Sequence, residues 1–106
     1  MNLIDHARSL LPSQTNDLAD SSRLDLERAF VEAVTFADAD EILDMVRQVL
    51  SEDWIGFPVW ARNLSYRLAC LLRPGDAALR REAAADLRSV GPDWDDIAAR
   101  LEEDGS

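Results

Sequence analysis

The feature that most constrains the fold is the spacing of apolar residues, which is helical along nearly the whole chain. Apolar side chains recur every three or four positions. No segment shows the sustained alternation of apolar and polar residues that is typical of a half-buried strand. The sequence therefore predicts an all-α protein without a sheet.

Proline and small polar residues mark the ends of the first two helices. Pro12 ends a first helix, and residues 12–22 are polar enough to form a loop with room for one short helical turn. Ser22 with Asp25 resembles a capping box, which predicts that the second helix begins there.

Four further signals divide the rest of the chain. The third helix is expected to begin near Asp38, and Pro58 suits the first position of the fourth. Residues 74–76 (Pro-Gly-Asp) and 91–93 (Gly-Pro-Asp) each combine a stop, a turn and a new N-cap. Residues 102–106 are expected to fray.

The apolar stripe of each helix predicts which face packs on the core. In the fourth helix the stripe consists of Trp60, Ala61, Leu64, Leu68, Leu71 and Leu72. Short connections require neighbouring helices to run antiparallel. The expected architecture is a single domain over residues 1–106. It is a compact bundle or short helical-repeat array of five to six helices in antiparallel hairpins.

The run from Tyr66 to Leu101 resembles a tetratricopeptide-type helix pair. Pro74 ends one helix, Ala84 provides a small residue in the next, and Gly91 stands at the turn before Ile97 and Ala98. Arg80, however, stands where the repeat has an aromatic residue. The resemblance implies a scaffold that binds a peptide or a protein.

The net charge of the chain indicates which kind of macromolecule it attracts. The net charge is −10, and all eleven basic residues are arginine, which indicates a GC-rich bacterial genome. Residues 1–53 and 91–106 are acidic, whereas residues 54–90 carry six arginines and three acids. Such a chain repels nucleic acid and anionic membranes and attracts basic proteins. The simpler alternative is that the charge only keeps a small protein in solution.

Composition also bears on the compartment. A single cysteine, Cys70, excludes an internal disulfide. The first residues lack the pattern of a signal peptide, and no stretch is apolar enough to span a membrane. We therefore expect a cytoplasmic protein.

Groups that could perform chemistry are few, so we expect neither an enzyme nor a cofactor or metal site. His6 is the only histidine, and Cys70 lies among apolar residues as an inert core thiol does. Asp93, Asp95 and Asp96 open a helix, where carboxylates cap backbone amides more often than they hold a metal ion. The four glycines are isolated and form no phosphate loop.

Aromatic residues near the connection between the third and fourth helices are candidates for an interface. Trp60 fits the inner stripe and is expected in the core. Trp54 and Phe57 are less constrained, and they either plug the end of the bundle or contact a partner.

The sequence is consistent with two functions that depend on binding another protein. The first is an inhibitor of a basic protein, of the bacterial immunity-protein or antitoxin type, that blocks a basic cleft with exposed acids. The candidate contacts are Asp25, Glu32, Asp40, Asp44, Asp93, Asp95 and Asp96. The alternative is a helical adaptor that binds a peptide through Trp54 and Phe57, or that self-associates.

Overall fold

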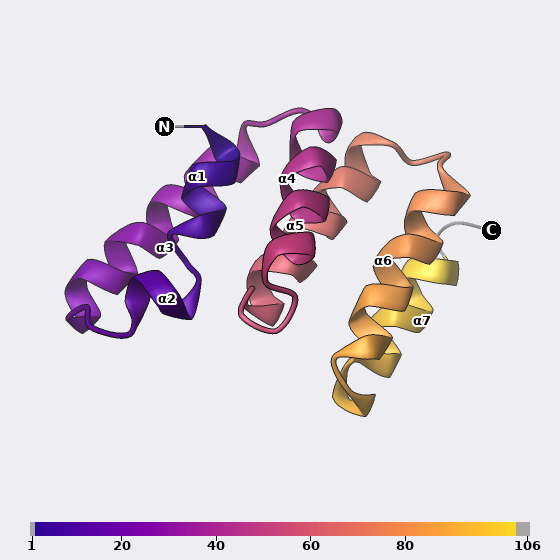
Figure 1. The fold of residues 1–106 in the computed structure, drawn as a ribbon. Helices are drawn as coiled ribbons and strands as arrows, with labels where there is room; N and C mark the ends of the chain where they lie inside the picture. The colour runs from indigo at the N-terminus through magenta and orange to yellow at the C-terminus, as the bar shows by residue number, and fades with distance from the viewer. Residues whose placement is uncertain (1, 104–106) are drawn as a thin grey trace.

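The computed structural model describes residues 2–103, and within that range every regular element is helical. The elements are α1 (Leu3–Arg8), α2 (Pro12–Thr15), α3 (Asp20–Thr35), α4 (Ala39–Glu52), α5 (Val59–Leu72), α6 (Ala77–Ser89), the 3-10 helix η1 (Pro92–Trp94) and α7 (Asp95–Glu103). Figure 1 shows three pairs of helices side by side: α1 with α3, α4 with α5, and α6 with α7. The prediction of an all-α fold built from antiparallel hairpin contacts is confirmed. No helix in the described part of the chain is long and apolar enough to cross a membrane.

Aspartate side chains start two of the long helices, as the sequence predicts. The Asp38 carboxylate accepts a hydrogen bond from the Glu41 amide at 2.8 Å, at the start of α4. Asp76 does the same for the Leu79 amide at 3.0 Å, at the start of α6. Each bond satisfies an amide that has no partner within its own helix.

Four predicted boundaries need correction. The first helix, α1, ends at Arg8, and Pro12 opens α2 instead of ending α1. The second predicted helix, α3, begins at Asp20 without a side-chain cap, so the capping box at Ser22 and Asp25 is wrong. Pro58 precedes α5 instead of opening it. The last helix continues to Glu103, and the rest of the predicted frayed tail, residues 104–106, lies outside the described residues. The short helical turn expected in the 12–22 loop is present as α2.

The core is centred on α4, which packs against both α1 and α5. Of its predicted stripe, Ile42, Met45, Val46 and Val49 are inaccessible to solvent and Leu50 is partly buried against them. Burying one such side chain contributes about 1.5–3 kcal/mol to the free energy of folding. The first helix packs on this core instead of fraying, because its apolar residues Leu3, Ala7, Leu10 and Leu11 form one buried face with the turn that follows.

The inner face of α5 differs from the predicted stripe. Its buried residues are Ala61, Arg62, Ser65, Tyr66, Ala69 and Cys70. By contrast, Trp60, Leu71 and Leu72 are 38%, 75% and 54% exposed. A stripe chosen by apolarity misses polar residues that are buried together with their partners. The Tyr66 hydroxyl, for example, donates to Glu82 Oε2 at 2.9 Å.

Arg62 is the largest fully buried side chain in the described residues and ties three parts of the fold together. Its Nη1 lies 3.3 Å from Asp86 Oδ1 on α6. Its Nη2 donates to the carbonyl oxygens of Phe57, at 2.9 Å, and of Trp54. The Trp54 ring lies over the same guanidinium, 5.3 Å from centroid to Cζ. The buried guanidinium of Arg62 therefore holds the backbone of the connection between α4 and α5 in place.

Candidate functional site

The outer face of α3 presents apolar side chains to solvent. Leu24 is 50% exposed and Val31 is 39% exposed, whereas Phe30 and Val34 on the inner face are fully buried. With Trp60 at the start of α5, these residues line a groove of about 470 Å³, which we call the α3 groove; its full lining is Leu24, Glu27, Arg28, Val31, Glu32 and Trp60. The five α3 residues are spaced three and four apart, so they share one side of the helix.

An aromatic cluster holds Trp60 in place. Its ring packs edge-on against Phe30, with centroids 5.9 Å apart and planes at 77°. Phe30 packs in turn against Phe57, at 6.3 Å and 89°. Trp60 is therefore anchored on one side by the core and remains 38% exposed on the other. An aromatic side chain already held in position loses little conformational entropy when a partner covers it.

Carboxylates border the apolar part of the groove. Glu27 and Glu32 line it, and Asp25 is exposed on the same helix. Within the described residues none of these three acids forms an ion pair, whereas Asp20 pairs with Arg23 at 3.1 Å. Arg28 is the one basic residue in the lining. The groove thus combines an apolar centre with a mostly acidic border whose charges are available to a partner.

The other predicted contact acids lie elsewhere. Asp40 and Asp44 are exposed on α4, where Asp40 forms an ion pair with Arg73. Asp44 borders a small hollow against the beginning of α1. Asp93, Asp95 and Asp96 are exposed at the start of the last hairpin helix, and in Figure 1 α7 lies at the end of the row opposite to α3. The seven predicted acids therefore occupy three separate regions and form no single surface.

The two aromatic residues predicted to contact a partner differ in exposure. Trp54 is 43% exposed and is held by Arg62, so it is accessible to a partner. Phe57 is only 1% exposed, because its ring packs against Phe30, and its prediction as a contact residue is wrong. Trp60, which the sequence places in the core, takes the accessible position instead.

The potentially reactive groups lie apart from the α3 groove. Cys70 is buried on α5, and burial raises the pKa of its thiol, so the thiol is neutral near pH 7. Among the described residues, no three histidine, cysteine, aspartate or glutamate side chains are grouped so that they could hold a metal ion.

Sequence reasoning missed Leu24, Val31 and Glu27 as site residues. The sequence does contain a pattern that indicates Leu24 and Val31. These two apolar residues are seven positions apart and fall outside the inner stripe that includes Phe30. A second apolar stripe on one helix indicates a second packed face.

Comparisons of the chain with family models, with curated proteins and with solved structures found no match.

Proposed function

We propose that this protein is a small acidic protein-binding module that binds a basic partner in the α3 groove. We further propose that it inhibits that partner, in the manner of an immunity protein or antitoxin. The observation that carries the proposal is the exposed apolar centre formed by Leu24, Val31 and Trp60, bordered by carboxylates that form no ion pair within the described residues.

The groove defines the chemistry of the segment that fits it. Covering Leu24, Val31 and Trp60 removes apolar surface from water, which favours a partner with apolar anchor residues. Asp25, Glu27 and Glu32 favour arginine or lysine around those anchors. A basic amphipathic helix or extended segment has both properties.

The charge of the whole chain supports the same class of partner. A net charge of −10 attracts basic proteins from a distance and speeds their encounter. Proteins that act on nucleic acids have basic clefts, which an acidic helical surface can cover. Inhibition by occlusion requires no catalytic group on this chain.

The experiment compares capture by three immobilised forms of the protein from native cells. The wild type is expected to retain one basic protein in equal amount at low salt and to release it at high salt. The double variant Leu24→Ser/Val31→Ser is expected to lose that protein. The control Phe36→Ser/Ile55→Ser removes two side chains that are 85% and 87% exposed outside the groove, and it is expected to retain it.

Equal capture by the groove variant and the wild type would exclude the α3 groove as the binding site. Addition of the purified protein is expected to inhibit the activity of the captured partner in proportion to complex formed. An unaffected activity would contradict the inhibitor function and favour an adaptor.

The acids can be separated by their effect on the association rate. Glu27→Gln/Glu32→Gln and Asp93→Asn/Asp95→Asn remove the same charge from opposite ends of the molecule. We expect the first pair to slow association with the captured partner more than the second, because charge near the contact dominates steering. Equal slowing would indicate that only the total charge matters.

A second candidate is a helical adaptor of the tetratricopeptide-like kind. It is favoured by the side-by-side hairpins of Figure 1 and by Leu71 and Leu72, which are 75% and 54% exposed at the end of α5. Such an array offers further faces for a peptide or for a second copy. Sedimentation of the wild type and of Leu71→Ser/Leu72→Ser tests self-association through this end. A monomer in both cases would exclude it.

A further inference from the structure

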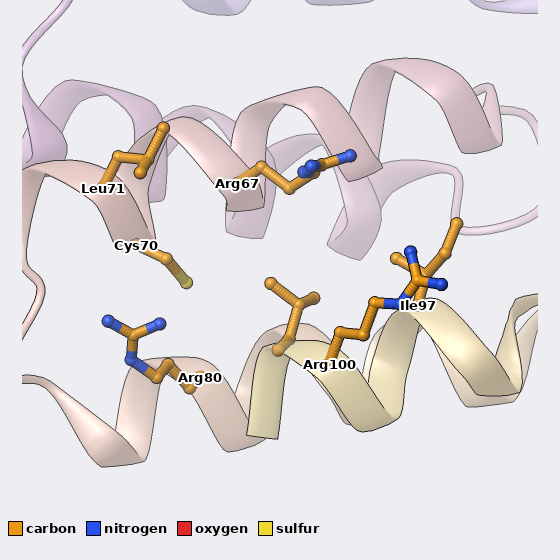
Figure 2. Close-up of a pocket in the computed structure, with 7 residues that line it drawn as sticks. Arg67, Cys70, Leu71, Arg80, Ile97 and Arg100 are labelled. Atoms are coloured by element: carbon orange, nitrogen blue, oxygen red, sulfur yellow. The ribbon is translucent and has the colours of Figure 1, made fainter. Parts of the chain in front are cut away.

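A second cavity lies at the other end of the molecule and is lined by three arginines. It has a volume of about 250 Å³ and lies where α5, α6 and α7 meet. Arg67 comes from α5, Arg80 from α6 and Arg100 from α7. In Figure 2, the Arg80 guanidinium lies beside Cys70 at one end of the cavity, while Arg67 and Arg100 extend from the two facing walls toward the other end.

No carboxylate neutralises these arginines within the described part of the structure. None of the residues that line the cavity is acidic, and none of the three arginines forms an ion pair with a described carboxylate. The two acids whose charges act on the neighbouring Cys70 are engaged elsewhere. Asp76 caps the Leu79 amide, and Glu82 binds Arg47 and Tyr66.

Arg80 is unusual because it is charged, 9% exposed and only partly satisfied. Its Nη2 donates to the Pro74 carbonyl oxygen at 2.7 Å. Its Nε is buried without a hydrogen-bond partner among the described residues. A buried guanidinium without a counter-ion is costly, and an anion in the adjoining cavity reduces that cost.

The rest of the lining suits the organic part of a ligand. Leu71, Ile97 and Leu101 are apolar, and the Cys70 thiol, neutral near pH 7 because burial raises its pKa, does not repel an anion. The cavity is too small for most drug-sized ligands. Three guanidinium groups match the several acceptor oxygens of a phosphate better than the two of a carboxylate.

We propose that the cavity between α5, α6 and α7 binds a small phosphomonoester. Its phosphate contacts Arg80 beside Cys70, the exposed side chains of Arg67 and Arg100 turn toward it from the other end of the cavity, and its organic group packs on Ile97 and Leu101. This site lies on different helices from the α3 groove and does not depend on the function proposed for that groove.

The acidity of the whole molecule does not prevent such binding. At physiological ionic strength, charges more than about 8 Å away are largely screened. The three arginines in direct contact therefore outweigh the distant acids of α3 and α4. The same screening makes the affinity fall with salt, as for any ion-paired ligand.

The test is a titration of ¹⁵N-labelled protein with phenyl phosphate, inorganic phosphate and benzoate at low ionic strength, followed by NMR. Phenyl phosphate is expected to give saturable shifts centred on Cys70, Leu71, Ile97 and Leu101, and to bind more tightly than the other two probes. Arg67→Gln and Arg100→Gln are each expected to weaken binding about tenfold or more, since each loses a charge-assisted hydrogen bond. Both arginines are exposed, so these variants are expected to fold.

Arg81→Gln is the matched control, because Arg81 is exposed on α6 but does not line the cavity. It is expected to leave the affinity unchanged, and so is the groove variant Leu24→Ser/Val31→Ser. Unsaturable shifts spread over all exposed arginines, or an equal loss in Arg81→Gln, would overturn the site. Benzoate binding as tightly as phenyl phosphate would overturn the assignment to a phosphate.

Discussion

At the scale of single residues, a buried pair of charged side chains joins α5 to α6. Arg62 is 1% exposed and Asp86 faces it from α6, yet Arg62 Nε and Asp86 Oδ2 have no hydrogen-bond partner in the described structure. Burial raises the pKa of Asp86, and the charge of Arg62 opposes that rise. A buried ion pair of this kind fixes geometry more reliably than it adds stability.

Replacing Arg62 tests this role. We expect Arg62→Met to lower the free energy of unfolding by about 3–5 kcal/mol, because it leaves the Asp86 carboxylate buried without its counter-ion. The double variant Arg62→Met/Asp86→Leu is expected to lose less than the sum of the two single variants. Urea denaturation followed by circular dichroism measures all four proteins. Additive losses would show that the two side chains act independently.

Glu82 links stability to pH. Hydrogen bonds from Arg47, at 2.7 and 3.0 Å, and from Tyr66 lower the pKa of Glu82 below its ordinary value of 4.5. The folded state therefore favours the carboxylate, and this contribution is present above pH 4.5 and is lost as the pH falls below it.

We expect Glu82→Gln to lose less stability than the wild type between about pH 5 and pH 3, because it cannot bind the extra proton. The difference is modest, since the Glu82 side chain is 33% exposed. Thermal melts across this range measure it, with Glu27→Gln as a control that removes the same charge from the α3 groove. Parallel pH profiles for wild type and Glu82→Gln would contradict the linkage.

At the scale of elements, turn residues decide how the hairpins close. Gly91 has φ +136° between α6 and η1, a conformation that side chains rarely adopt. Gly75, between α5 and α6, has an ordinary negative φ and open space around its Cβ position. The two glycines thus lie in equivalent turns between helices, but only Gly91 has a backbone conformation that disfavours other residues.

Gly91→Ala is expected to lower the free energy of unfolding by about 1–3 kcal/mol through backbone strain alone, because an added Cβ meets no atom within 4 Å. Gly75→Ala is expected to change it by less than about 0.5 kcal/mol. Chemical denaturation of both variants makes the comparison. An equal effect of the two substitutions would mean that the Gly91 conformation carries no cost.

Sequence patterns predict an element well where one residue type has one physical role. The aspartates at 38 and 76 and the glycine at 91 mark boundaries correctly, because capping and positive φ are local requirements. The face of α5 was not predictable in this way, since burial of Arg62 depends on Asp86, which is 24 positions away. The α3 groove depends on the half-exposed position of Trp60. That position is set by the packing of Trp60 against Phe30 and of Phe30 against Phe57, which the sequence pattern does not show. The arginine-lined cavity likewise needs three helices to meet.

At the scale of the whole molecule, charge repulsion opposes compaction. The net charge is −10, and the surface ion pairs, such as Arg8 with Glu52 at 2.5 Å, offset little of it. We expect the melting temperature to rise when sodium chloride is added from a few millimolar to about 0.2 M, because screening weakens the repulsion. Calorimetry at several salt concentrations measures the trend. A falling melting temperature would mean that the ion pairs outweigh the repulsion.

The row of helix pairs has a consequence for how the molecule folds and opens. Apart from the contacts of α1 with α3 and α4, the main contacts join helices that follow one another closely in the chain. Structures dominated by such short-range contacts have low contact order and fold within microseconds to milliseconds. Each end of a linear stack also has only one neighbour to hold it. The α6–α7 hairpin is held to α5 and α4 mainly through Asp86 and Glu82. We therefore expect it to open as a separate unit of local unfolding while α4 and α5 stay closed.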